Sequence, residues 1–431
     1  MTGLVFMTRE APDEELLVAT AANHIDWMKR LARCSGGTAA EDRGVHWTCV
    51  SRAATEVTAA IVEPPGPAVR EQLDSLLTVS RDRCADRVGY WAFAESYRQP
   101  LGGWLGARGF RLGGKPHWMA VDLRSVPEPP SEAELAAQTG IAVTDHFTPL
   151  PGSGLPCFHP DTVAVRAAMA AQRPRRVWHA IQWQDGTPIG QQSWCATSGP
   201  LGVCGLHDLV IVPGSRVAGF GFARVQWLFR FGLDLGCRYL VTNAAQEASG
   251  LYRMVGFRSL GFGQTWWLRS DVLRDPVPPG KVEFAEAIAA GDTASLGAVT
   301  RRDAGAVNSP LANRMSPLEF AAATGCPDSA RWLIGNGARP EVIPYWELGW
   351  RQDARDLLAR HPELVNQRRP RSGKAPLHLA VERDDLELTE TLLAAGADTS
   401  VKDDQFGGTP LDWAQEFRRL RIIAALKRAP A

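Results

Sequence analysis

The last third of the 431-residue chain repeats itself at a fixed interval. The segments SPLEFAAATG (316–325), APLHLAVERD (375–384) and TPLDWAQEFR (409–418) each place Pro-Leu after a small residue and an Ala three positions after that Leu. Pro376 and Pro410 lie 34 positions apart. A constant period of this length indicates a repeat architecture, in which each unit buries its apolar face only by stacking on its neighbours. We therefore expect this region to be a solenoid rather than a compact globule.

The repeated segments resemble the ankyrin repeat. Their Pro-Leu openings match the turn that begins the first helix of that repeat, and RWLIGNGARP (331–340) and ETLLAAGADT (390–399) match the end of its second helix. The copy at 345–367 keeps the second helix but lacks the opening. The resemblance implies an all-α solenoid of about five units, whose extended face binds a protein partner or another part of the same chain.

Two proline-rich stretches divide the rest of the chain. They are RSVPEPPSEAEL (124–135) and DVLRDPVPPGK (271–281), and such segments resist both helix and sheet pairing. The predicted domains are therefore 1–125, 126–274 and 275–431, each of ordinary domain size.

Composition restricts the partners and the location. Lys and Arg together number 47, as do Asp and Glu, so no overall field favours nucleic acid or an anionic membrane surface. The chain has no run of 18 apolar residues, and its first residues do not form a signal-peptide pattern. Eight cysteines are scattered without a CxxC pair, so we expect no metal site, free thiols and a cytoplasmic protein.

The middle segment alternates strand and helix patterns. The predicted order is a pair of strands joined by an Asp-Gly turn at 177–197, a strand at 202–213, a helix at 215–236, a strand at 237–244, a short helix at 247–255 and a hairpin-like pair at 256–269. Arg216, Gly219 and Gly221 stand where the strand at 202–213 becomes helix. Glycine there serves either a tight connection or an anion cradle of converging N–H groups.

This order resembles the GNAT acetyltransferase superfamily. The matched residues are Pro213, Arg216, Gly219, Gly221, Leu251, Tyr252, Gly256 and Phe257. They form a strand, then R-x-x-G-x-G into a helix, then L-Y-x-x-x-G-F after a further strand, with 36 positions from Arg216 to Tyr252. The resemblance covers roughly 140–270 and, because several independent elements agree, implies an α/β (α+β) fold with a mixed central sheet.

The resemblance also implies a chemistry. Acetyl-CoA would be the co-substrate, without a metal, and its acyl group would pass directly to an amine in a ternary complex. Backbone N–H groups of the turn would bind the coenzyme pyrophosphate, and the turn residues are Arg216, Val217, Ala218, Gly219, Phe220 and Gly221. The preceding strand residues Leu209, Val210 and Ile211 would pair with the pantetheine arm and polarise the thioester carbonyl. Tyr252 would protonate the departing thiolate.

The resemblance identifies the general base and one coenzyme contact less directly. Strand alternation predicts that His207 shares a face with Leu209 and Ile211, and His207 occupies a position that a catalytic histidine or acid fills in some relatives. Asp208 and Glu247 are the alternatives, and a structural role for the histidine stays open. The family commonly has Asn where this chain has Ala245, so Asn243 would take its place as a coenzyme contact.

The first segment is a weaker copy of the second. GGWLGARGFRLGGKPHWMAVDLRS (102–125) parallels 249–272, but Leu105 stands in the position of Tyr252. Prolines 64, 65 and 67 also remove N–H donors from the turn that would hold phosphate. We therefore expect a noncatalytic GNAT-like domain at 1–125 that helps to wall the acceptor site.

The alternative to an enzyme is an interaction protein, in which the repeats recruit a partner and the tandem GNAT pair is a scaffold. The acceptor itself has no signature in the sequence.

Overall fold

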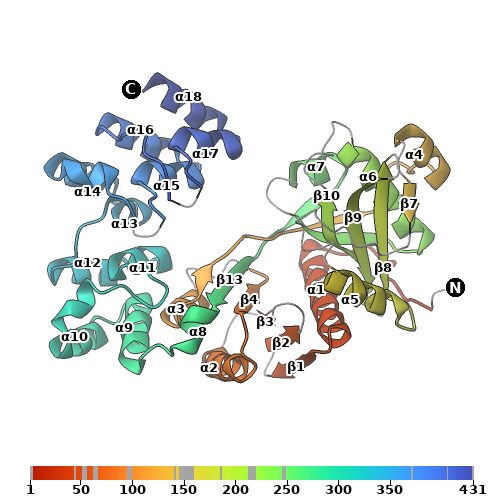
Figure 1. The fold of residues 1–431 in the computed structure, drawn as a ribbon, viewed down its shortest axis with the longest axis horizontal. Helices are drawn as coiled ribbons and strands as arrows, with labels where there is room; N and C mark the ends of the chain where they lie inside the picture. The colour runs from red at the N-terminus through yellow and green to blue at the C-terminus, as the bar shows by residue number, and fades with distance from the viewer. Residues whose placement is uncertain are drawn as a thin grey trace. The chain divides into compact units, whose positions relative to one another are not determined.

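The structure of the protein is a computed structural model (Figure 1). It describes residues 3–42, 45–50, 56–61, 67–94, 100–139, 142–144, 160–184, 187–211, 220–244, 249–369, 372–404 and 406–429. The chain forms two compact units. The first comprises Met1–Ser96 and Phe110–Pro276, and the second comprises Tyr97–Gly109 and Val277–Ala431. The predicted boundary at 125/126 does not separate the units, and it stays a prediction.

The first unit is a mixed α/β structure. Its helices are α1 (Asp13–Cys34), α2 (Pro67–Asp82), α4 (Glu132–Thr139), α5 (Pro160–Ala171), α6 (Phe220–Asp234), α7 (Ser249–Met254) and α8 (Ser270–Arg274). Its strands are β1 (Thr38–Asp42), β2 (Val45–Val50), β3 (Glu56–Ile61), β4 (Arg87–Ala92), β5 (Arg111–Leu112), β6 (His117–Asp122), β7 (Ala142–Thr144), β8 (Val177–Gln184), β9 (Thr187–Ala196), β10 (Cys204–Ile211), β11 (Tyr239–Ala244), β12 (Arg258–Phe262) and β13 (Gln264–Arg269).

These strands form two sheets that exchange a strand. One sheet has the order β1-β2-β3-β4-β13-β5, and the other has the order β12-β6-β11-β10-β9-β8-β7. Strand β6, from the N-terminal half, lies between β11 and β12, whereas β13, from the second half, lies between β4 and β5. The expected hairpin at 256–269 is therefore wrong. Its two strands, β12 and β13, join different sheets.

Helix α1 packs against both sheets. It begins after Pro12 with Asp13, Glu14 and Glu15, acidic residues that favour the positive end of a helix. Its buried Leu16 and Ala19 pack with Val241 of β11, and Ala21 and Ile25 pack with Ala60 of β3. One helix thus supplies core residues to both sheets, which ties the two halves of the unit together.

The second unit is all helical. Its elements are α3 (Pro100–Ala107), α9 (Pro279–Ala290), α10 (Thr293–Arg302), η3 (Ala304–Val307), α11 (Pro317–Thr324), α12 (Pro327–Gly335), α13 (Val342–Glu347), α14 (Arg351–Arg360), η4 (Pro362–Asn366), α15 (Pro376–Glu382), α16 (Leu386–Ala394), α17 (Pro410–Glu416) and α18 (Leu420–Arg428). Ser316 with Glu319, and Thr409 with Asp412, form capping boxes where the repeated Pro-Leu begins a helix. The predicted fold class, mixed sheets followed by an all-α solenoid, is confirmed.

Helix α3 belongs to the helical unit, although its sequence lies inside the predicted N-terminal domain. Two glycines allow the close approach. A Cβ atom at Gly103 would lie 2.5 Å from Ala289 Cβ, and one at Gly106 would lie 2.4 Å from the Phe320 ring. Arg108 then donates to Glu286 at 2.7 Å, with both side chains nearly buried. The repeats are thus completed by a helix from more than 150 residues upstream, as Arg108 and Glu286 lie 178 positions apart.

A half-buried carboxyl group, that of Glu341, joins two neighbouring repeats. Ser316 donates a hydrogen bond to Glu341, the residue before α13, and Arg369 pairs with the adjacent Glu319. Burial, and then the Glu319 charge, raise the pKa of Glu341 to about 7. Because the folded pKa lies above the unfolded one, this carboxyl group stabilises the fold fully only below the unfolded pKa of 4.5.

Glu341→Gln is therefore expected to remove a pH dependence of stability. In the natural chain the stabilisation of the fold by protonated Glu341 is lost as pH rises from about 4.5 to about 7. The total loss in the free energy of unfolding is roughly 1–3 kcal/mol. Thermal unfolding of both chains at about pH 5 and about pH 8 checks it. The variant should gain midpoint temperature relative to the natural chain at the higher pH only. An equal difference at both pH values would contradict the assignment.

In the part of the chain that the structure describes, no helix combines the length and the apolar character needed to cross a membrane.

Candidate functional site

The two central parallel strands of the larger sheet part after a short pairing. Strand β10 pairs with β11 only at Cys204, Gly205 and Leu206, opposite residues 240–242. Beyond this point β10 continues to Ile211 along β9, and β11 continues to Ala244 along β6. Over those last residues no ladder joins β10 to β11, so one edge of β10 is available to a ligand in the middle of the sheet.

A β-bulge lies where the strands part. The register of β10 on β9 shifts between His207 and Val210, and Asp208 has a φ of 50°. Arg166 of α5 pairs with the Asp208 carboxylate, and its guanidinium lies 4.4 Å from the centre of the Trp27 ring. A bulge adds one residue to one strand and turns the following side chains to the other face. This explains why Leu209 packs on the α6 side while His207 faces α1, although the sequence predicted a shared face.

The smaller sheet has no such opening. Its equivalent parallel strands, β3 and β4, pair without a break from Glu56 opposite Arg87 to Ile61 opposite Ala92. Both edges of β3 are thus occupied along its length, by β2 and by β4. Among the described residues the two halves share a strand order, but the parallel pair parts in the second half and not in the first.

His207 is held by a specific hydrogen-bond chain. The Asn23 amide donates to the Cys195 carbonyl at 2.7 Å, which turns the Asn23 oxygen toward His207 Nε2 at 3.0 Å. That oxygen only accepts, so Nε2 carries the proton and Nδ1 carries the lone pair. The imidazole also stacks on Trp27, with ring centres 4.4 Å apart and planes 4° from parallel. Asn23 and Arg166 were not predicted, since they lie on α1 and α5, far from any motif.

Burial keeps the histidines near the opening neutral. Burial, and then the neighbouring His24 and Arg166, lower the pKa of His207 well below its ordinary value. Burial also lowers the pKa of His24 to about 4. At neutral pH both imidazoles are therefore uncharged, and either one would accept a proton only from a strongly acidic donor.

Of the other predicted site residues, Asn243 lies beside the opening, Tyr252 lies in the apolar core of the larger sheet, and several lie outside the described residues. Tyr252 of α7 is 3% exposed and packs edge-on against Phe257, with ring centres 5.0 Å apart. Asn243 is half-buried on β11, just beyond the last β10–β11 pair. Helix α6 begins at Phe220, so Phe220 and Gly221 form its first turn. Arg216, Val217, Ala218 and Gly219 lie outside the described residues, as does Glu247.

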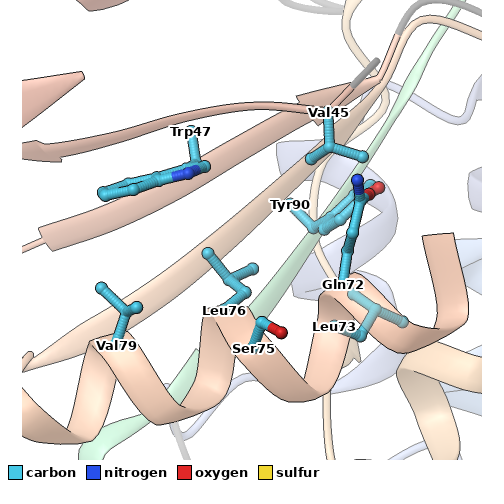
Figure 2. Close-up of a pocket in the computed structure, with 8 residues that line it drawn as sticks. All are labelled: Val45, Trp47, Gln72, Leu73, Ser75, Leu76, Val79 and Tyr90. Carbon is cyan, nitrogen blue, oxygen red and sulfur yellow. The ribbon is translucent and has the colours of Figure 1, made fainter. Parts of the chain in front are cut away.

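A small cavity lies elsewhere, between β2, β4 and α2 (Figure 2). Its volume is about 60 Å³, and it is lined by Val45, Trp47, Gln72, Leu73, Ser75, Leu76, Val79 and Tyr90. This space is far smaller than the usual ligand pocket of ≈ 300 Å³ or more. We regard it as a packing defect of the smaller sheet and not as the functional site.

The helical unit has an open groove of about 690 Å³ along α14 and α16. Leu358, Pro362 and Ala394 give it an apolar floor, and Arg355 pairs with Glu387 at 2.8 Å on its rim. A surface of this kind is suited to contact with a protein segment.

Comparisons with known proteins found similarity to solved structures and to one family. No curated protein sequence matches it. Among solved structures, a GCN5-related N-acetyltransferase from Kribbella flavida is 13% identical with a TM-score of 0.40, and the match covers 57% of this chain and 93% of the other. A functionally unknown conserved protein from Staphylococcus epidermidis is 11% identical with a TM-score of 0.38, over 55% of this chain and 95% of the other. Residues 372–404 match the family described as "Ankyrin repeat". The predicted resemblance is confirmed there, and this part of the chain is an ankyrin repeat.

Proposed function

We propose that the protein is an acyl-CoA-dependent N-acyltransferase that transfers an acetyl group from acetyl-CoA to an amine. The observation that carries the proposal is the parting of β10 and β11 after three paired residues, beside the bulge at His207–Val210. The uninterrupted β3–β4 pair of the other sheet provides an internal comparison, because the same topology there leaves no opening.

The proposed binding mode uses backbone groups. The pyrophosphate would lie at the start of the 15-residue helix α6, where free N–H groups and the helix dipole favour an anion. Residues Arg216 to Gly221 are the proposed loop. The pantetheine arm would pair with the edge of Leu209, Val210 and Ile211, and Asn243, one residue beyond the last β10–β11 pair, would contact it from β11. One strand N–H would stabilise the growing charge on the thioester oxygen.

The proposed proton path uses two side chains. The amine nitrogen attacks the thioester carbon, and the carbon–sulfur bond breaks. His207 Nδ1 would accept the proton lost from nitrogen, and Asn23 fixes the required tautomer. The Tyr252 hydroxyl would donate a proton to the departing thiolate and recover one from solvent. The products are an amide and free coenzyme A.

Gly219→Glu is expected to weaken acetyl-CoA binding by about tenfold or more, roughly 1.4 kcal/mol, because its carboxylate would meet the pyrophosphate. Isothermal titration of the full chain measures this. Gly66→Glu places the same charge in the corresponding turn of the first half and is the matched control, expected to leave affinity unchanged. Unaltered affinity in Gly219→Glu would remove the loop from the proposal.

Tyr252→Phe is expected to lower turnover while leaving acetyl-CoA affinity close to that of the natural chain. Loss of the hydroxyl removes only the proton donor, which should cost about 10²-fold in rate. Release of coenzyme thiol, with affinity measured by titration, separates the two effects. Equal turnover would remove Tyr252 from the acid role.

A second candidate is an interaction protein whose repeats recruit a protein partner while the first unit is a noncatalytic, acyl-CoA-binding scaffold. The ankyrin repeat at 372–404 and the groove along α14 and α16 favour it. Acetyl-CoA binding without thiol release toward any amine would support this candidate over the enzyme. A cytoplasmic location is proposed for either, supported by the seven free cysteines among the described residues.

A further inference from the structure

Aromatic and histidine rings from both halves of the first unit meet on the α1 side of the larger sheet. We call His24, Trp91, Phe93, Trp118 and His207 the ring cluster. His24 lies 4.6 Å from Trp91 and 5.6 Å from Trp118, measured between ring centres. Phe93 stacks on Trp118 at 4.6 Å, and His24 is 5.9 Å from His207. The cluster thus combines α1, β4, β6 and β10.

The ring cluster lies at the opening between β10 and β11. Trp118 stands directly opposite Asn243, the first residue of β11 beyond its pairing with β10. Helix α6 covers one face of these strands, because Val225 and Leu228 pack with Leu206 and Leu240. The ring cluster lies on the other face, beside α1. An acyl-CoA whose pyrophosphate lies at the start of α6 and whose pantetheine arm enters the opening would therefore present its acyl group to the ring cluster.

Two polar atoms of the cluster lack partners. His24 Nε2 and Trp118 Nε1 are buried and have no hydrogen-bond partner among the described residues. The two side chains belong to residues that are 7% and 1% exposed. Buried polar groups are nearly always paired, with protein or with water. Two unpaired groups in one cluster therefore indicate a place for a ligand that carries a hydrogen-bonding substituent.

The surroundings disfavour a cation. The cluster contains no carboxylate, and the nearby Asp208 is paired with Arg166. Arg166 itself contributes positive potential, which acts on His207. An alkylammonium group would thus enter a site with neutral rings and a guanidinium close by, and none of the five described residues of the ring cluster carries an anion to offset its desolvation.

We propose that the acyl acceptor is a weakly basic amine on a flat aromatic ring, and that it binds against the ring cluster. The inference rests on the proposed acyltransferase function. Aromatic faces would hold the ring, and His24 or Trp118 would bond its substituent. Such an amine is uncharged at neutral pH and enters without losing a proton first.

The reaction balances with this acceptor. The arylamine nitrogen attacks the acetyl carbon, and the carbon–sulfur bond breaks. Attack gives a tetrahedral adduct in which the nitrogen is an N-aryl ammonium. This group is acidic enough to give its proton to a histidine of lowered basicity. One proton reaches the sulfur, so an arylamine and acetyl-CoA give an acetanilide and coenzyme A.

The test compares two probes of similar shape on the full chain with acetyl-CoA. They are 4-methylaniline and 4-methylbenzylamine, which differ chiefly in the basicity of the nitrogen. Thiol release above an enzyme-free blank, with the amide product identified by mass spectrometry, gives kcat/KM at neutral pH. We expect the aniline to be favoured by at least about tenfold, equivalent to 1.4 kcal/mol.

Two tryptophan variants locate the site. Trp91→Leu should raise KM for 4-methylaniline by about tenfold and leave KM for acetyl-CoA unchanged. Trp47→Leu is the matched control, because Trp47 lines the small cavity beside α2, and it should change neither constant. Equal increases in the two variants would show that the amine does not bind at the ring cluster.

The outcomes separate this inference from the function on which it rests. Failure of acetyl-CoA to bind overturns both. Binding with faster use of the benzylamine, or with use of neither amine, overturns the acceptor inference and leaves the coenzyme site in place.

Discussion

Gly106→Leu is expected to destabilise the helical unit by about 3 kcal/mol or more, one of the two largest effects predicted for this chain. A Cβ atom at this position would lie 2.4 Å from Cε2 of Phe320 and 3.2 Å from the Asn313 amide nitrogen. The Phe320 ring is almost fully buried and is rigid, so it has little room to move. Helix α3 would have to separate from α9 and α11.

Hydrogen exchange and thermal unfolding measure the effect. Amides of α9 and α11 should lose protection in Gly106→Leu. Gly280→Leu is the matched control, because a side chain at Gly280 meets no atom within 4 Å. If the two variants lose protection equally, α3 does not complete the repeats.

Asp208→Asn is expected to destabilise the first unit by about 2–3 kcal/mol, because it leaves the Arg166 guanidinium buried beside a neutral amide. The Arg166 side chain is 6% exposed and the Asp208 side chain 31%, so solvent reduces the cost below that of a fully buried pair. Asn tolerates the positive φ of this position, so the substitution tests the charge and not the backbone.

Chemical denaturation of three chains isolates the ion pair. Adding Arg166→Met to Asp208→Asn also removes the buried guanidinium and should recover much of the lost stability. Asp328→Asn removes the carboxylate of an exposed pair with Arg331 and should cost less than about 1 kcal/mol. A loss of the same small size in Asp208→Asn would show that the pair does not hold the bulge.

The features that could be predicted well depend on short local sequence patterns. The 34-residue period was sufficient to predict the solenoid, because three of the repeats carry their own Pro-Leu helix start. The strand, turn and helix order around α6 was also local, and the helix begins at Phe220 within the predicted glycine pattern. The family match at 372–404 falls on the copy with the most complete motif.

Strand exchange could not be predicted in the same way. Strands β6 (HWMAVD) and β13 (QTWWLR) are both apolar, Trp-bearing and of equal length. Either sequence satisfies an interior position of either sheet, so alternation alone does not select the partner. The short connection between β12 and β13 favoured a hairpin, but in the folded protein the two strands pair in different sheets.

The candidate site stays a prediction, and one detail of its geometry was wrong. His207 and Leu209 were placed on one face because regular alternation was assumed, and the bulge at Asp208 separates them. Nothing in the local sequence signals that Asn23 orients His207 or that Arg166 holds the bulge, since both contacts span distant segments. The roles of Tyr252 and of the loop from Arg216 remain proposals that the variants above address, and the role of Asn243 remains a proposal.

The exchanged strands have a consequence for how the two halves fold. Strand β6 comes from the N-terminal half, yet it lies between β11 and β12, in the interior of the sheet of the second half. Strand β13 fills the equivalent place in the smaller sheet. Deletion of either half would therefore remove a middle strand from the sheet of the other, so neither half is expected to fold as a separate domain.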